Sequence, residues 1–107
     1  MALCWLSGPR DTLGPRMKRI HRRLFDLNDR IRALEAEARQ VAAELELHRS
    51  IDADAQRDAA VGNYIDREEA GLTRSDVRRF EKTLAMLEAK RARLTDKRDR
   101  LVDSLPS

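Results

Sequence analysis

Side chains that could carry out chemistry are few in this sequence and widely spaced. His21 and His48 are separated by a long stretch with no cysteine near either of them, and Cys4 is the only cysteine of the chain. This pattern matches no metal-binding or catalytic motif with a known spacing. We therefore expect no catalytic residues, no metal site and no cofactor. We interpret His48 as a polar residue that marks the register of a helix pair.

The densest group of charged side chains is a basic segment, which comprises Arg16, Lys18, Arg19, Arg22 and Arg23. Five cations on about two helical turns could neutralise several phosphates, so DNA or RNA is one candidate partner. This hypothesis predicts an affinity that falls steeply with salt and disappears when Arg19, Arg22 and Arg23 are replaced by glutamine. The ordinary role of such a run is a solvated helix face, and we favour that interpretation.

The net charge of successive segments changes sign twice along the chain. Residues 1–40 hold nine Arg or Lys against five Asp or Glu, residues 41–76 hold four against nine, and residues 77–107 hold nine against five. The acidic middle contains the carboxylates of Asp66, Glu68 and Glu69, which we consider possible contacts for a partner. The overall net charge of +3 therefore conceals a strong separation of basic and acidic regions.

Composition favours a helical interaction protein over an enzyme. Charged residues make up 38% of the 107 residues and aromatic residues only 4%, which is typical of coiled coils and poor material for a walled cavity. The length suffices for one domain at most. A single cysteine excludes an internal disulfide, and no stretch is apolar enough to span a membrane, so we expect a cytoplasmic protein.

Apolar residues alternate at spacings of three and four over residues 17–45, which predicts a helix that buries one narrow stripe against another helix. The stripe contains Met17, Ile20, Leu24, Leu27, Ile31, Leu34, Ala38, Val41 and Leu45, and it reaches His48. Beyond His48 the apolar residues Ile51 and Ala55 follow a shifted frame. This shift predicts a local change of phase in the stripe.

The predicted fold is all-α, an antiparallel two-helix coiled-coil hairpin that dimerises into a longer coiled coil or a four-helix bundle. We expect a flexible tail over residues 1–14, helix one over about 15–69, a turn over about 70–73 and helix two over about 74–105. Gly71 suits a helix C-terminus, and the spacing of Thr73 and Asp76 fits a helix N-cap. Gly62, Asn63 and Tyr64 mark either a local break in helix one or a partner contact.

A turn at Gly71 has a consequence for assembly. Helix two would end opposite Glu37, so helix one would extend past it and expose Met17, Ile20, Leu24, Leu27, Ile31 and Leu34. A soluble monomer rarely exposes such a stripe. We therefore expect a homodimer that buries these six residues. The same register places Glu44 beside Arg98.

These features predict a non-enzymatic coiled-coil protein that acts as an adaptor or regulator through self-association and the binding of another protein. One alternative is a transcription regulator that binds RNA polymerase or a sigma-like factor. In outline, the predicted hairpin is similar to the coiled-coil hairpins of transcript-cleavage factors, which present acidic tips to the polymerase. A further alternative is a sensor of a small charged ligand, held between the helices by Arg91 and Arg98.

Overall fold

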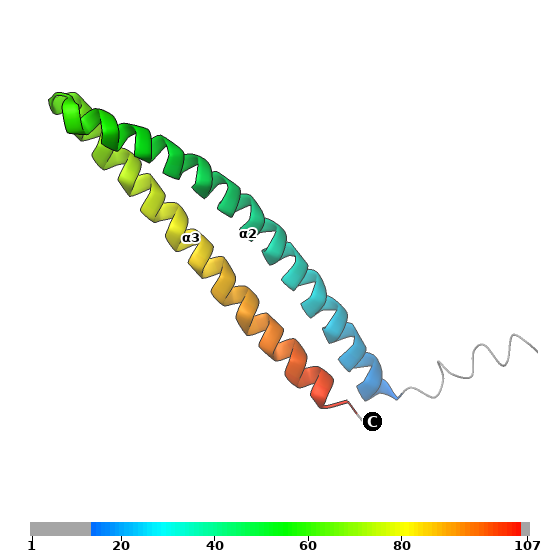
Figure 1. Cartoon of the computed structure of the whole chain (residues 1–107). Coiled ribbons are helices and arrows are strands. Elements are labelled where there is room, and N and C mark those ends of the chain that lie inside the picture. Colours follow the sequence, from blue (N-terminus) through cyan, green and yellow to red (C-terminus); the bar gives the residue numbers. More distant parts are fainter. Residues whose placement is uncertain (1–13, 106–107) are drawn as a thin grey trace, which may run out of the picture.

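Two long helices form an antiparallel hairpin in the computed structural model, which describes residues 14–105 (Figure 1). Helix α2 spans Pro15–Val61 and helix α3 spans Tyr64–Asp103, with only Gly62 and Asn63 between them. The two helices lie side by side along their length, so the start of α2 and the end of α3 meet at one end, which we call the open end. The predicted all-α helical hairpin is confirmed. The predicted tail, apart from Gly14, lies outside the described residues.

Local sequence explains both helix starts. Pro15 occupies the first turn of α2, where a missing N–H costs no hydrogen bond. At the start of α3, the Asn63 side chain accepts hydrogen bonds from the backbone N–H groups of Ile65 and Asp66, at 3.0 and 3.3 Å. The Asp66 carboxylate accepts in return from the Asn63 N–H at 3.3 Å. These reciprocal bonds form a capping box that fixes the turn.

The predicted turn at residues 70–73 is wrong, and helix one is shorter than expected. Gly71 lies inside α3, and the Thr73 hydroxyl donates to the Asp52 carboxylate and to the Ala70 carbonyl rather than capping a helix. Two causes favour the earlier turn. Asn63 and Asp66 form a stronger N-terminal cap than Thr73, and a turn at Gly62 gives two helices of 47 and 40 residues that cover each other almost completely.

The apolar seam of each helix follows an unbroken heptad pattern. Asp52, not Ile51, continues the α2 seam after His48, and Ile51 is 44% exposed, so the predicted change of phase is wrong. Lettering Met17 as position a puts the seam of both helices at positions a and d. The α2 seam consists of Met17, Ile20, Leu24, Leu27, Ile31, Leu34, Ala38, Val41, Leu45, His48, Asp52, Ala55 and Ala59. The α3 seam consists of Asp66, Ala70, Thr73, Val77, Phe80, Leu84, Leu87, Arg91, Leu94, Arg98, Leu101 and Leu105.

Candidate binding surfaces

The six residues predicted to mediate self-association face α3 instead of solvent. Leu27 and Ile31 are buried, while Met17, Ile20, Leu24 and Leu34 are half-buried in the seam. At the open end, Met17 and Ile20 line a common hollow with Ser104, the C-cap of α3. The predicted overhang of helix one is therefore wrong, because the turn lies nine residues earlier than expected and α3 reaches the start of α2. The argument for a dimer through these residues no longer holds.

The hairpin has two flanks, and more side chains are half-buried on one flank than on the other. Because the helices run in opposite directions, positions e of both helices share one flank and positions g share the other. The half-buried residues outside the seam fall mostly at position e, and only Asp76 and Thr83 are at position g. We call the e side the closed flank and the g side, with its adjoining c positions, the open flank. The half-buried e residues are Asn28, Glu35, Ala42, Gln56 and Thr95.

Polar contacts between the helices also lie in the seam or on the closed flank. Gln56 donates to the Ala70 carbonyl at 3.0 Å and accepts from Arg74 at 2.6 Å. The Thr73 hydroxyl donates to the Asp52 carboxylate at 2.8 Å. Within residues 14–105, every side-chain hydrogen bond between α2 and α3 involves seam or e residues. The open flank contributes none of them, so no side-chain hydrogen bond between the two helices occupies its polar groups.

The fold alters the titration of the Asp52 carboxylate. Hydrogen bonds from Gln56 and Thr73, together with the nearby Arg74 guanidinium, lower its pKa below the ordinary value, against a smaller opposing effect of burial. A lowered pKa means that the folded state favours the ionised form. The stabilisation is therefore complete above the unfolded pKa of about 3.9 and is lost as pH falls through the lower folded pKa.

Replacing Asp52 by asparagine should make the free energy of unfolding depend less on pH in the acid range. We expect wild type to be more stable than Asp52→Asn by a constant amount above about pH 5, and the difference to shrink as pH falls below about 3.9. Chemical unfolding followed by circular dichroism between neutral and acid pH measures this. Glu46→Gln is the control, because the Glu46 side chain is exposed outside the open flank and pairs with Arg49 of the same helix. A difference that grows toward acid pH would contradict the assignment.

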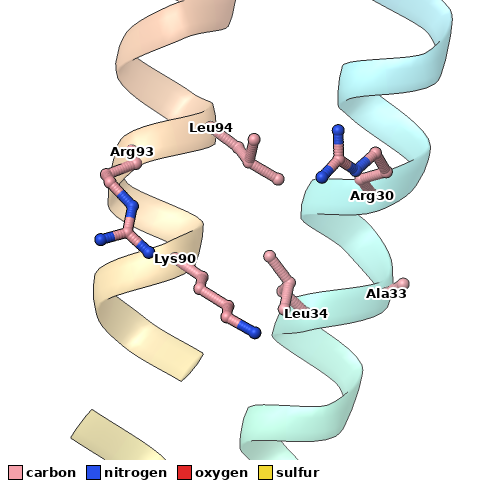
Figure 2. Close-up of a pocket in the computed structure, with 6 residues that line it drawn as sticks. All are labelled: Arg30, Ala33, Leu34, Lys90, Arg93 and Leu94. Carbon is pink, nitrogen blue, oxygen red and sulfur yellow. The ribbon is translucent and has the colours of Figure 1, made fainter. Parts of the chain in front are cut away.

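A groove on the open flank combines an apolar floor with cationic walls. It has a volume of about 440 Å³ and is lined by Arg30, Ala33, Leu34, Lys90, Arg93 and Leu94. Figure 2 shows Leu34 and Leu94 directed into the space between the helices, with the ends of Arg30 and Lys90 reaching toward the same space. Among the described residues, none of the three cations forms an ion pair. We call this hollow the basic groove.

Charge reverses along the open flank near the middle of each helix. From the open end to the basic groove, positions c and g hold eight cations and one acid: Arg16, Arg19, Arg23, Arg30, Lys90, Arg93, Lys97 and Arg100, with Asp26. From there to the turn they hold six acids and one cation: Glu37, Glu44, Asp54, Asp58, Glu69 and Asp76, with Arg79. We call these the basic half and the acidic half. Within each half, both helices thus carry charge of the same sign on this flank, as Asp58 and Glu69 do, which does not stabilise the hairpin.

The closed flank shows no comparable reversal. Its e and b positions hold two cations and three acids in the half next to the open end, and five cations and two acids in the half next to the turn. The strong separation of charge is therefore a property of one flank of the hairpin.

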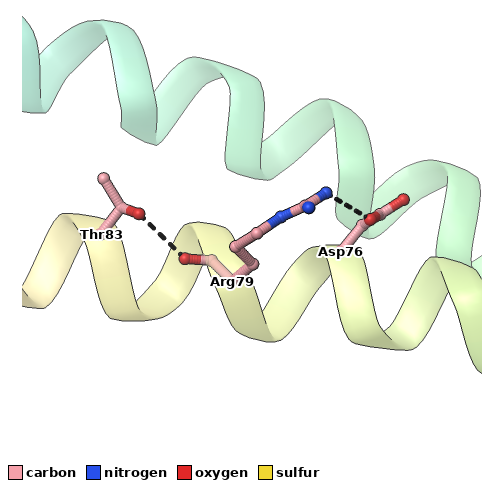
Figure 3. Close-up of polar contacts among 3 residues, drawn as sticks. All are labelled: Asp76, Arg79 and Thr83. Carbon is pink, nitrogen blue, oxygen red and sulfur yellow. Dashed lines mark hydrogen bonds and ion pairs between the residues drawn. The ribbon is translucent and has the colours of Figure 1, made fainter.

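One ion pair within α3 reduces the charge of the acidic half. Arg79 donates to the Asp76 carboxylate at 2.6 Å, one helical turn away, and the Thr83 hydroxyl donates to the Arg79 carbonyl at 3.1 Å (Figure 3). Both contacts stay on one helix, so they do not link α3 to α2. The other acids of this half remain exposed.

Exposed apolar side chains gather on the same flank. Nine large hydrophobic residues are exposed among those described, and six of them occupy positions c or g in the acidic half. Phe25, Tyr64 and Val102 are the three that lie elsewhere. The open flank therefore presents apolar and acidic side chains next to the turn, and an apolar-floored basic groove toward the open end. The six are Leu47, Ile51, Val61, Ile65, Leu72 and Met86.

Three of the exposed apolar side chains project at the turn itself. Val61, Tyr64 and Ile65 are 90%, 73% and 60% exposed, and they surround the Asn63 cap. The capping box holds the backbone here, so these side chains are presented by an ordered turn. We call Val61, Tyr64 and Ile65 the apex. Exposed carboxylates of Asp58, Glu68 and Glu69 lie within one to two helical turns of it.

The predicted anion and nucleic-acid contacts are all exposed at the start of α2. They point to different sides, because Arg16, Arg19 and Arg23 occupy the open flank, while Lys18 and Arg22 line a shallow hollow with His21 and Phe25. The basic segment therefore encircles the helix instead of forming one face. Proximity in the sequence alone does not show which face of a helix each of these residues occupies.

The residues predicted to contact a ligand or a partner do not form one site. Some of them already bind other residues of the hairpin, and the others lie apart from these. Arg98 does not meet Glu44; it donates to Asn28 at 3.4 Å and pairs with Asp99 at 3.1 Å. Arg91 is half-buried in the seam, and the Asp66 carboxylate serves the capping box. Glu68 and Glu69 remain exposed near the turn. The His48 ring stacks on Phe80 of α3, with ring centroids 4.5 Å apart, so its partner is within the hairpin.

Within residues 14–105, no group of three or more His, Cys, Asp or Glu side chains is placed to hold a metal ion. Neither α2 nor α3 contains a segment with the length and apolarity that a membrane crossing requires.

Comparison with known proteins gives no relative from which a role could be transferred. No family model, curated protein or solved structure matches this chain. Functional inference therefore depends on the geometry of the apex and the two flanks.

Proposed function

We propose that the protein is a non-enzymatic helical-hairpin protein that acts as an adaptor or regulator by binding another protein through its apex. The observation that carries this proposal is the exposure of Val61, Tyr64 and Ile65 on a turn ordered by the capping box. Large apolar side chains on a preorganised turn lose little conformational freedom on binding, which favours recognition by a pocket of a partner. The hollows elsewhere on the hairpin are open grooves, which suit a binding surface better than a catalytic site.

The surroundings of the apex indicate the chemistry of the partner. Asp58, Glu68 and Glu69 place exposed carboxylates around the apolar apex. A matching surface would be an apolar pocket with a basic rim, since complementary charge raises the rate of association and excludes unsuitable partners. Regulation of transcription is one specific form of this proposal, with RNA polymerase or a sigma-like factor as the partner.

Site-specific photo-crosslinking tests the apex as the contact. A photoreactive phenylalanine analogue in place of Tyr64 should yield one crosslinked species with another protein in cells that naturally contain this chain. The matched control is the same analogue at Ala89, an exposed position on the outer face of α3, where we expect no such species. Val61→Ser together with Ile65→Ser should abolish the crosslink, because the apolar contact is lost.

The identity of the crosslinked protein distinguishes the forms of the proposal. Capture of a polymerase subunit or sigma-like factor would support transcription regulation, and capture of another protein would support an adaptor role. Crosslinking of equal strength at positions 64 and 89, or at neither position, would contradict binding through the apex.

A further inference from the structure

We propose that the open flank is a self-complementary surface on which a second copy of this chain docks antiparallel, forming a four-helix bundle. The inference rests on the proposed function only in treating the hairpin as an interaction protein. It concerns the sides of the hairpin and not the apex. It also replaces the dimer expected from the sequence, whose contact residues are covered by α3.

The distribution of charge along the open flank favours docking of a second copy. The basic half carries eight cations against one acid and the acidic half six acids against one cation. Within one hairpin, facing flank positions such as Asp58 and Glu69 repel each other, so folding of the monomer does not explain this arrangement. A second copy turned end to end sets each basic half on an acidic half. The same surface then supplies both sides of the contact, as an isologous two-fold interface requires.

Charge also selects the orientation of the second copy. Two two-fold arrangements stack the open flanks face to face. An axis along the hairpin makes the copies parallel and brings basic half onto basic half. An axis across the hairpin makes them antiparallel and stacks α2 on α2 and α3 on α3 of the second copy. The charge reversal lies between Arg30 and Glu37 in α2, close to the middle of Pro15–Val61, so the antiparallel copies overlap over most of their length.

The distribution of apolar side chains on the open flank also favours docking of a second copy. Outside the apex, the acidic half exposes four large hydrophobic side chains, which are Leu47, Ile51, Leu72 and Met86. The basic half offers the groove of about 440 Å³ with Leu34 and Leu94 at its floor (Figure 2). Antiparallel docking brings projecting apolar side chains over an apolar groove, and a buried apolar centre with a charged rim is the usual anatomy of a stable interface. Outside the apex, the large hydrophobic side chains that the closed flank exposes among the described residues are Phe25 and Val102.

The seam between α2 and α3 is less covered on the open flank than on the closed flank. Side-chain hydrogen bonds between α2 and α3 lie in the seam or on the closed flank, and the half-buried flank residues are mostly at position e. Most seam residues remain half-buried, with Leu24, Leu34 and Leu94 among them. A second hairpin on the open flank would complete their burial without disturbing the contacts already made.

Charge-swap complementation tests this interface. One variant reverses the basic half of α2 with Arg16→Glu and Arg30→Glu. The other reverses the acidic half with Glu44→Lys and Asp58→Lys. In a register that sets Arg30 against Glu44 of the second copy, Arg16 meets Asp58, because Arg16 precedes Arg30 by 14 residues and Asp58 follows Glu44 by 14 residues in the antiparallel copy. All four side chains are exposed, so the hairpin itself should fold in both variants.

Light scattering on a sizing column gives the assembly state. Wild type should have twice the 12.3 kDa mass of the chain and should dissociate more readily as salt is raised. Each variant alone should be a folded monomer under the same conditions, with a dimer Kd at least about tenfold higher. An equimolar mixture should restore the dimer, since both contacts then join opposite charges.

A matched control places two reversals on the closed flank. Arg39→Glu with Arg78→Glu makes the same change of net charge at exposed b positions and should leave the dimer intact. The proposal is overturned if wild type stays monomeric at about 100 μM, if the control dissociates as readily as the open-flank variants, or if the mixture fails to associate. None of these substitutions touches Val61, Tyr64 or Ile65, so apex crosslinking and dimerisation fail independently.

Discussion

Gly62→Ala is expected to destabilise the hairpin by about 2 kcal/mol, through crowding and loss of the helix cap. A Cβ atom at position 62 would lie 2.5 Å from the Asp58 carbonyl oxygen and would overlap the Asp66 carboxylate that closes the capping box. The carbonyl belongs to the last turn of α2 and cannot move without unwinding it. Displacing Asp66 would in turn leave the Asn63 N–H without its acceptor. Backbone crowding and loss of the cap therefore act together at this one position.

Gly71→Ala is the matched control and should change stability in the opposite direction. A Cβ atom at position 71 meets nothing within 4 Å, and the residue lies within α3. Alanine loses less conformational freedom than glycine on entering a helix, so a gain of about 0.5–1 kcal/mol is expected. Urea unfolding of the two variants and wild type, followed by far-ultraviolet circular dichroism, compares them directly. Destabilisation by Gly71→Ala, with Gly62→Ala neutral, would place the turn at Gly71.

The position of the turn could not be chosen from local signals alone. Gly71 followed by Leu72, and Thr73 followed by Asp76, resemble a helix end and a helix start, while Asn63 and Asp66 have the same capping chemistry. Pairing over the whole chain decides between them. A turn at Gly62 covers the stripe from Met17 to Leu34, whereas a turn at Gly71 leaves it exposed. An exposed stripe of this kind is therefore a sign of the wrong register and not of a dimer interface.

Seam residues were largely predictable, and the candidate surface was not. The spacing from Met17 to Leu45 predicted the α2 face that packs on α3, because burial of apolar residues every three and four positions leaves a clear pattern. Following apolar residues past His48 then led to Ile51, although the polar Asp52 occupies the seam and bonds Thr73.

The open flank becomes visible only after every residue has a heptad letter. Arg30, Lys90 and Arg93 are far apart in sequence, and nothing in their local context marks them as neighbours in a groove. With the turn placed at Gly62, the letters alone bring these cations together and separate the basic half from the acidic half. The correct register was therefore the missing information, and it required the structure.

Leu87→Ala should reduce the free energy of unfolding by about 3 kcal/mol, one of the largest losses available to a single substitution in this chain. Leu87 is only 3% exposed at a seam position near the middle of α3. Just six hydrophobic residues are buried among those described, so each provides a large part of a small core. A two-helix structure cannot refill the space from a second layer, since α2 and α3 are the only helices within residues 14–105. The cavity should therefore persist.

Phe25→Ala provides a stringent control for this prediction. It removes a larger side chain, but Phe25 is 69% exposed at a b position outside the open flank, so a change of no more than about 0.5 kcal/mol is expected. Both variants should be unfolded at several protein concentrations, because dimerisation adds stability that depends on concentration. Equal losses for the two variants would mean that α2 and α3 do not pack along this seam. A large loss for Leu87→Ala alone would locate the core where the heptad register of both helices requires it.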